Sequence, residues 1–201
     1  MIGNLDEERI SNDRRLQKLL VDPFWGYLWP GSYALHKHVQ QHGDSTIKGR
    51  NVLDFASGCG LSAITASRLG PVEVLANDID DFAIAAVEVN SALNGVEPGR
   101  IGLTAENLCA NGTVVKELFK DPSLPLTILC GDVFYDTDFA AVVMEWLAKQ
   151  DGAEIYVGDP GRHALPRSGE LEEVAEYDLP PLLRDTNNGM TSVKCFRYRS
   201  V

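Results

Sequence analysis

The chain has 201 residues, of which 44% are hydrophobic and 23% are charged, and this makeup excludes a disordered or fibrous protein. Its formal net charge is −11, from 18 Lys and Arg against 29 Asp and Glu, which argues against nucleic acid as a partner because phosphate backbones select basic faces. A chain of this length buries a full core by itself, so we predict a single domain over residues 1–201.

The cysteines and the apolar runs indicate whether the chain binds a metal, crosses a membrane or is secreted. The cysteines, Cys59, Cys109, Cys130 and Cys195, form no CxxC pair and have no nearby His at the spacing of zinc ligands, so we expect reduced thiols and no metal site. No run of about 18 apolar residues exists to cross a membrane. Residues 1–10 carry acidic side chains where a secretory signal would be apolar, and we therefore expect a cytoplasmic protein.

The predicted elements begin with a polar helical extension over residues 1–21 and an aromatic loop over residues 22–32, assigned to substrate and cofactor. From Asn51 onward, short apolar runs alternate with helical patterns, which is typical of a parallel sheet. The predicted strands are Asn51–Phe55, Val72–Ala76, Ile101–Thr104, Leu126–Cys130 and Glu154–Val157. The predicted helices are Leu61–Leu69, Asp81–Leu93, with Phe82, Ala86, Val89 and Leu93 on its apolar face, and Asp138–Lys149, capped by Asp138.

Two further β-like runs, Glu172–Leu179 and Thr191–Arg199, close the chain, and the Pro and Asn-Gly turn signals between them leave no convincing helix. We predict that they form an antiparallel pair at the edge of the sheet. The expected fold is therefore α/β, a Rossmann-like three-layer sandwich with a mostly parallel seven-stranded sheet and an antiparallel C-terminal edge.

A glycine-rich turn follows the first predicted strand, in Ser57-Gly58-Cys59-Gly60. Because Gly58 and Gly60 lack Cβ atoms, the backbone can approach a ligand closely there. Asp78 ends the next strand, 20 residues after Gly58, where a carboxylate can accept hydrogen bonds from both hydroxyls of a ribose. The pattern predicts a nucleotide-cofactor site.

Asp54 bears on which cofactor this site takes. Gly58, Gly60 and Ala63 also satisfy the G-x-G-x-x-G/A pattern of dinucleotide enzymes, so an oxidoreductase stays open. A carboxylate four residues before Gly58 would repel a dinucleotide pyrophosphate, but it could hold the ammonium of a methionine moiety directly or through water. Asp54 therefore favours S-adenosylmethionine.

These residues resemble the first motif of the class I, seven-strand S-adenosylmethionine-dependent methyltransferases, an acidic residue followed by a glycine-rich turn. One departure is Ala56, where many members of the family have glycine. The resemblance implies further cofactor contacts from Ser57 in the loop, from Ile79 near the adenine and from Asn107 near the adenine edge. Ordinary loop capping is the alternative for Ser57 and Asn107.

The loop after the fourth predicted strand, Gly131–Tyr135, borders the ligand crevice of such a sheet. Asp132 can hold an incoming amine, and Phe134, Tyr135 and Trp29 could line a slot for a lysine side chain. We predict Asp132 and Tyr135 as catalytic residues, and both of them and Phe134 as substrate contacts. The stretch resembles the D-x-F-Y signature of the protein-lysine methyltransferases called methyltransferase family 16.

Three stretches resemble the electron transfer flavoprotein β-subunit lysine methyltransferases and their bacterial relatives, namely Asp22–Gly31, Ser57–Gly60 and Gly158–Arg162. The resemblance implies protein-lysine N-methylation with that β-subunit as the protein substrate, Trp29 near the cofactor and Asp132 near the target amine. Arg162 either contacts the substrate or braces its turn through a salt bridge.

Other functions stay open beside this one. A small-molecule N-methyltransferase acting on a nicotinamide-like amine would use the same cofactor site behind a more closed aromatic lid. The chain could also be a catalytically inactive cofactor-binding protein, although the intact Gly58 turn and Asp132 argue against that. The sequence leaves the oligomeric state unknown.

Overall fold

The computed structural model describes residues 23–166, 169–187 and 189–199. Its centre is a seven-stranded sheet in the order β3-β2-β1-β4-β5-β7-β6. Strands β1 to β5 pair in parallel, whereas β7 is antiparallel to both β5 and β6, so the predicted sheet with its antiparallel edge is confirmed. The strands are β1 (Asn51–Phe55), β2 (Glu73–Asn77), β3 (Ile101–Thr104), β4 (Leu126–Gly131), β5 (Glu154–Asp159), β6 (Leu171–Asp178) and β7 (Ser192–Tyr198).

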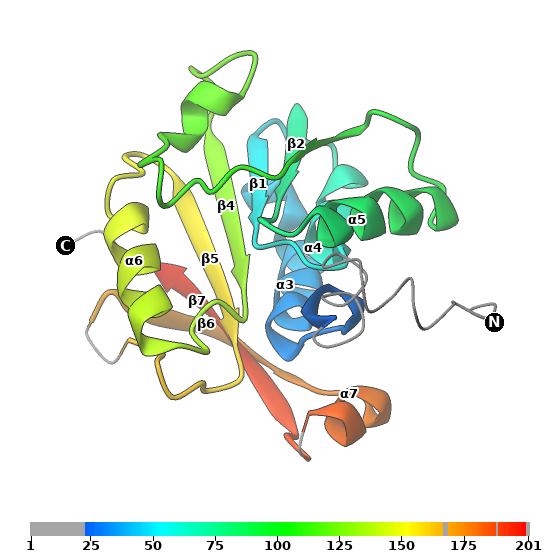
Figure 1. Cartoon of the computed structure of the whole chain (residues 1–201), viewed down its shortest axis with the longest axis vertical. Helices are drawn as coiled ribbons and strands as arrows, with labels where there is room; N and C mark the ends of the chain where they lie inside the picture. The colour runs from blue at the N-terminus through cyan, green and yellow to red at the C-terminus, as the bar shows by residue number, and fades with distance from the viewer. Residues whose placement is uncertain (1–22, 167–168, 188, 200–201) are drawn as a thin grey trace, which may run out of the picture.

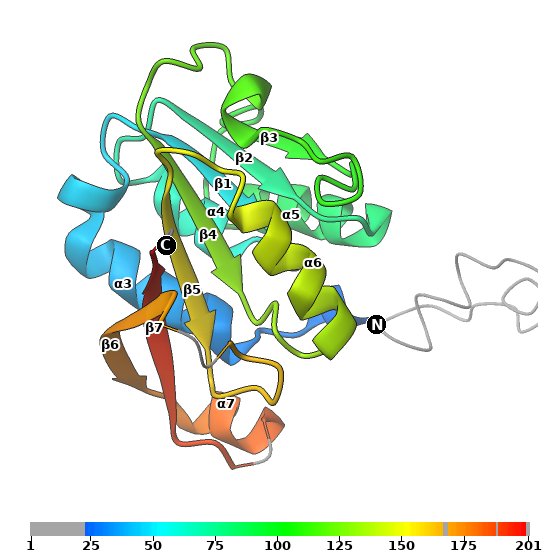
Figure 2. The same cartoon turned by 90° about the vertical axis from the view of Figure 1, so that its left-hand side faces the viewer.

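Helices cover both faces of this sheet. Figure 1 shows α3, α4 and α5 on one side of the strands and α6 on the other, and Figure 2 shows α6 in front of the strands with α4 and α5 behind. The predicted three-layer sandwich is therefore confirmed. The helices are α3 (Pro30–Thr46), α4 (Leu61–Ser67), α5 (Asp81–Leu93), α6 (Thr137–Leu147) and α7 (Pro181–Thr186), with short 3-10 turns at η1 (Phe24–Gly26) and η2 (Val115–Leu118).

The core lies in two layers because successive side chains of a strand point to opposite faces. On β1, Leu53 and Phe55 enter the layer beneath α6, where the rings of Phe55 and Trp146 lie 4.6 Å apart. Val52 enters the other layer, where it joins Leu35 of α3. All five residues of β1 are buried, including its two polar residues, Asn51 and Asp54, as expected for a strand covered on both faces.

Helix α3 was missed by the sequence prediction, which had a loop to residue 32 and no element between that loop and Asn51. Pro30 occupies the first turn, where its missing N–H costs nothing, so α3 begins inside the predicted aromatic loop. Its buried face mixes Ala34, Leu35 and Val39 with His38, which weakens the apolar periodicity that a sequence reading depends on.

Three smaller predictions are also corrected. Asp136, and not Asp138, caps α6, because its carboxylate accepts the backbone N–H of Phe139 at 2.8 Å. Helix α7 lies between the last two strands, where no helix was predicted. Helix α5 buries Ala83 and Val87, whereas Val89 and Leu93 of the predicted apolar face are exposed.

The predicted extension over residues 1–21 lies outside the described residues. In the part of the chain that the structure describes, no helix combines the length and the apolar character needed to cross a membrane.

Candidate active site

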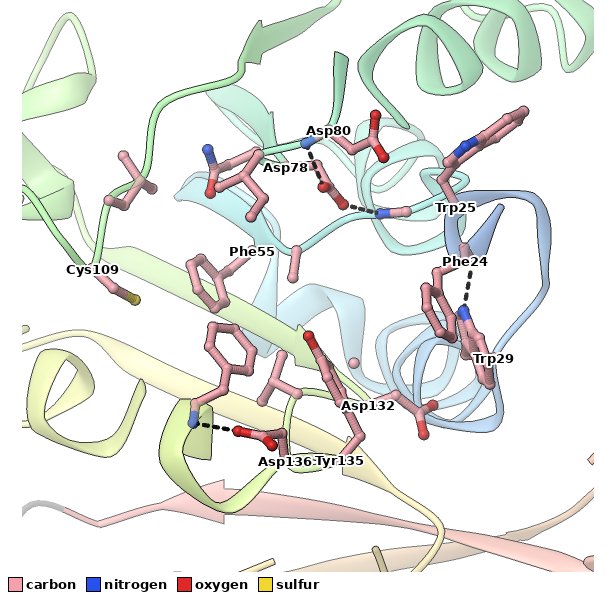
Figure 3. Close-up of a pocket in the computed structure, with 18 of the residues that line it drawn as sticks. Phe24, Trp25, Trp29, Phe55, Asp78, Asp80, Cys109, Asp132, Tyr135 and Asp136 are labelled. Atoms are coloured by element: carbon pink, nitrogen blue, oxygen red, sulfur yellow. Dashed lines mark hydrogen bonds between the residues drawn. The ribbon is translucent and has the colours of Figure 1, made fainter. Parts of the chain in front are cut away.

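A cavity of about 1110 Å³ opens at the carboxyl ends of β1, β2 and β4, the edge of a parallel α/β sheet where ligands bind. Aromatic side chains and carboxylates from distant parts of the chain meet around it (Figure 3). The predicted site residues that line the cavity are Trp29, Gly58, Asp78, Ile79, Asn107, Asp132 and Tyr135. Asp54, Ser57, Gly60 and Phe134, all described residues, do not line it.

The glycine-rich turn between β1 and α4 uses its two glycines differently. Gly58 has a φ of +50° and presents its backbone to the cavity, as predicted. Gly60 has a φ of +83°, and a Cβ there would lie 2.9 Å from a methyl group of Val87 on α5. Gly60 therefore permits close packing of α5. Ala56, at the position where the resembled family has glycine, has a φ of +52°, a conformation that glycine adopts more readily.

Asp78 ties the glycine-rich turn to the end of β2. Its carboxylate accepts the backbone N–H groups of Gly58 and Asp80, each at 3.0 Å (Figure 3). The predicted pairing of Gly58 with Asp78 is thus present as a direct contact. Ile79 follows Asp78 in the chain, lines the same cavity and is 67% exposed.

Asn107 lines the same cavity from the loop after β3, and its side-chain oxygen also accepts the backbone N–H of Ala110 at 3.0 Å. Asn107 therefore caps its loop and lines the cavity, and its contact with the adenine edge stays a prediction. Sequence reasoning missed its neighbour Asn77, which lines the cavity and donates to the carbonyls of Thr104 and Glu106 at 3.1 and 2.9 Å. The available signal was its place directly before Asp78.

Asp54 and Ser57 differ from their predicted positions. The Asp54 carboxylate is buried behind the turn, where it accepts the backbone N–H of Ala63 at 2.8 Å, and burial raises its pKa to about 8. It therefore caps the first turn of α4 and does not contact the cavity. Ser57 is buried as well, and its hydroxyl has no hydrogen-bond partner among the described residues. Neither side chain reaches the cavity in this structure, so neither is placed to contact a ligand there directly.

Asp132, at the end of β4, lies on the cavity wall in a left-handed conformation with a φ of +56°. One carboxylate oxygen accepts the backbone N–H of Gly31, and the other accepts Nε and Nη2 of Arg162 at 2.8 and 2.6 Å. Burial raises the pKa of this carboxyl, and Arg162 opposes the rise. The salt-bridge reading of Arg162 is therefore correct, and its guanidinium also lines the cavity.

The aromatic residues of the predicted lysine slot separate into two groups. Tyr135 is half-exposed at the cavity mouth, where its ring lies 5.5 Å from that of Phe139. Trp29 forms part of the wall, and its indole N–H donates to the carbonyl of Phe24 at 2.8 Å. The prediction for Phe134 is wrong, because its side chain is fully buried in the core layer beneath α6.

Several wall residues were not predicted as site residues. They are apolar or soft side chains that the sequence alone does not separate from core residues, among them Phe55, Leu108, Cys109 and Phe139, whereas Phe24 and Trp25 belong to the predicted aromatic loop. Burial raises the pKa of the Cys109 thiol to about 11, so this group is a neutral part of the wall. Within the described residues, no three His, Cys, Asp or Glu side chains are grouped to hold a metal ion.

Comparison with known proteins gives this geometry a family. The family model for ribosomal protein L11 methyltransferase (PrmA) matches residues 37–118. The chain is 32% identical over 195 residues to the electron transfer flavoprotein β-subunit lysine methyltransferase homolog of Caenorhabditis elegans, with 90% of this chain and 80% of that protein covered. It is 35% identical over 179 residues to the electron transfer flavoprotein β-subunit lysine methyltransferase of Rattus norvegicus, and there it spans 65% of the relative's length and 85% of its own.

Solved structures agree in fold. The magnesium protoporphyrin IX methyltransferase of Synechocystis, with bound S-adenosylmethionine, superposes with a TM-score of 0.58 at 11% identity over 98% of both chains. The ribosomal protein L11 methylase of Lactobacillus delbrueckii gives a TM-score of 0.50 at 18% identity, covering 83% of this chain and 78% of that one. With a relative at 32% identity that it covers to 80%, the chain belongs to the family of electron transfer flavoprotein β-subunit lysine methyltransferases, which are class I methyltransferases.

Proposed function

We propose that the chain is an S-adenosylmethionine-dependent protein-lysine N-methyltransferase whose substrate is the β-subunit of electron transfer flavoprotein. The observation that carries the proposal is a single cavity with two unlike halves. The Gly58 turn and Asp78 form one half, and Trp29, Asp132 and Tyr135 form the other. The names of the worm and rat relatives support the same substrate.

The residues of the first half fit the cofactor. The cavity of about 1110 Å³ is larger than the roughly 300–1,000 Å³ of a typical small-ligand pocket, which leaves room for a cofactor and a lysine side chain together. The Gly58 backbone faces this space without a side chain, and Asp78 supplies the carboxylate that suits a ribose. We assign Ile79 and Asn107, which line the same cavity, to the adenine. When bound, the cofactor supplies a methyl group on a positively charged sulfur.

The residues of the second half would position the acceptor. The lysine would have to present an unprotonated nitrogen to the methyl group that the cofactor supplies, so its ammonium would first have to lose a proton. Burial raises the pKa of Tyr135, which keeps its phenol protonated, so we assign the proton to solvent and give Tyr135 the role of orienting the amine. Aromatic faces at Tyr135 and Trp29 would hold the lysine stem. Asp132 as the contact of the amine stays a prediction.

The test uses methyl-labelled S-adenosylmethionine and purified electron transfer flavoprotein, with lysine methylation located by mass spectrometry. We expect label on lysines of the β-subunit, and its loss in the Asp132→Asn variant. A second reaction holds a panel of small amines, including nicotinamide, in place of the protein. Label confined to the small amines, or no lysine label at all, would refute the proposal and favour a metabolite methyltransferase.

A further inference from the structure

Arg162 links two parts of the cavity wall. It follows β5, and its side chain is 21% exposed. Its Nε and Nη2 atoms donate to the same oxygen of Asp132 at 2.8 and 2.6 Å, while its guanidinium carbon lies 5.4 Å from the centre of the Trp29 ring. A planar cation can form an ion pair at its edge and interact with an aromatic ring through its face, which a lysine ammonium does less well. The guanidinium thus contacts both Asp132 and Trp29.

The Arg162 backbone is fixed independently of these contacts. Asp159, the last residue of β5, is fully buried, and one oxygen of its carboxylate accepts the backbone N–H groups of Gly161 and Arg162, both at 2.7 Å. This turn orients the arginine side chain toward the cavity. Arg162 is therefore anchored at both ends, by its backbone and by its guanidinium, which distinguishes it from a surface arginine in a transient ion pair.

Asp132 connects this anchor to the start of α3. Its second carboxylate oxygen accepts the backbone N–H of Gly31, and the backbones of Gly31 and Gly158 are so close that a Cβ on Gly158 would lie 2.0 Å from the Gly31 carbonyl oxygen. The ends of β4 and β5 are thereby packed against the first turn of α3. Trp29 directly precedes that turn, so its position depends on this junction.

The segment Phe24–Trp29, called here the aromatic strap, continues from the junction along the cavity. Trp29 lies 5.9 Å from Phe24 and 5.8 Å from Tyr27 between ring centres. Farther along, Trp25 stacks on Phe82 of α5 at 6.3 Å, close to the Asp78 side of the site. The strap therefore rests on α5 at one end and on the Arg162 and Asp132 pair at the other (Figure 3 shows Phe24, Trp25, Trp29 and Asp132).

We propose that Arg162 is a positioning residue for methyl transfer, which holds the aromatic strap over the cavity by joining the Asp132 carboxylate to the Trp29 ring. This inference rests on the proposed function as far as it concerns catalysis. Its structural part, the dependence of Trp29 on Arg162, can be measured without any substrate. An alternative role is that Arg162 occupies the place of the substrate cation and leaves when lysine binds, and this alternative predicts opposite kinetics.

The test compares three variants in the full chain. Arg162→Met removes the charge and keeps the length, and Arg162→Lys keeps the charge without the two-pronged contact. Arg199→Met is the matched control, because Arg199 also donates Nε and Nη2 to one carboxylate oxygen, that of Glu172, at the exposed sheet edge. Each variant is measured for kcat and KM with the flavoprotein substrate and for acrylamide quenching of tryptophan fluorescence.

We expect Arg162→Met to lower kcat roughly 10- to 100-fold with a smaller change in KM, as for a misplaced reacting group. Arg162→Lys should recover part of this loss, and Arg199→Met should match the original protein. Quenching should increase in Arg162→Met, and this increase should disappear when Trp29→Phe is added. Unchanged quenching in both Arg162 variants would overturn the proposal, whether or not the protein methylates lysine.

Two kinetic results would also overturn it. An unchanged kcat in Arg162→Met and Arg162→Lys would show that the link has no part in methyl transfer. A lower KM with an equal or higher kcat would show that Arg162 competes with the substrate cation for Asp132. Absence of lysine methylation by the original protein would instead refute the proposed function, and the quenching measurement would still decide the contact between Arg162 and Trp29.

Discussion

The free energy of unfolding should decrease less steeply with rising pH when Asp54 is replaced by Asn. Asp54 is 2% exposed, and burial raises its pKa from an ordinary 3.8 to about 8. Between these values the folded chain holds one more proton than the unfolded chain. The contribution of Asp54 to stability is therefore complete below about pH 4 and is lost once the pH passes about 8.

The size of the effect follows from proton linkage. Between about pH 4 and about pH 8, a single group that stays protonated only in the folded state lowers the free energy of unfolding by about 1.4 kcal/mol for each unit that the pH rises. Asparagine keeps an oxygen that can accept the Ala63 N–H, so the cap of α4 is preserved while the titrating charge is removed. The variant should therefore differ from the original mainly in its pH dependence.

Urea unfolding of both proteins at about pH 6 and about pH 7 measures this difference. The decrease in unfolding free energy between the two conditions should be larger by about 1.4 kcal/mol in the original protein than in Asp54→Asn. Burial also raises the pKa values of Asp132 and Asp159, but their contributions are shared by both proteins and cancel in the comparison. Equal pH dependence in the two proteins would show that Asp54 is ionised in the fold.

Three further predictions concern other parts of the structure. Asp78→Ala should weaken S-adenosylmethionine binding in calorimetry by at least about tenfold, because it removes the cavity carboxylate and its bonds to the Gly58 and Asp80 backbones; unchanged affinity would exclude Asp78 from the cofactor site. Gly158→Ala should cost about 3 kcal/mol or more in urea unfolding, since its Cβ would lie 2.0 Å from a backbone oxygen, and a cost below about 1 kcal/mol would mean that the junction with α3 yields readily. Asp136→Ala should cost about 1 kcal/mol through loss of the α6 cap, whereas Asp138→Ala should leave stability almost unchanged; the reverse ranking would restore the original cap prediction.

The fold was predictable from the sequence where an apolar strand is bounded by turn-forming residues. The bounds of β1 and β3 agree with the sequence prediction residue for residue, because Gly and Asn turn residues lie close to these strands. The buried face of α5 was predicted wrongly. Val89 and Leu93 are apolar but 57% and 79% exposed, while the small Ala83 is fully buried. Apolar spacing identified the helix correctly but did not fix which side of it faces the sheet.

The two halves of the site differ in how far sequence could predict them. Gly58 and Asp78 belong to one strand-helix-strand unit, whose right-handed crossover brings them together whatever the rest of the chain does. The contact of Asp132 with Arg162 joins loops after two different strands, and no spacing rule sets its geometry. Phe134 was placed wrongly because the sequence shows only that it shares a loop with Asp132 and Tyr135, and not that its side chain packs into the core beneath α6.

The same division appears in the comparisons. The ribosomal protein L11 methyltransferase model matches residues 37–118, a range that contains Gly58, Asp78 and Asn107 but ends before Asp132 and begins after Trp29. The worm relative, in contrast, aligns with 90% of this chain. The match to the ribosomal protein L11 methyltransferase model thus includes the Gly58 and Asp78 half of the cavity and leaves out Trp29, Asp132 and Tyr135. Arg162 and its two contacts, Asp132 and Trp29, lie in the segments outside that match, so the variants at Arg162 probe the part of the cavity that the ribosomal protein L11 methyltransferase model does not cover.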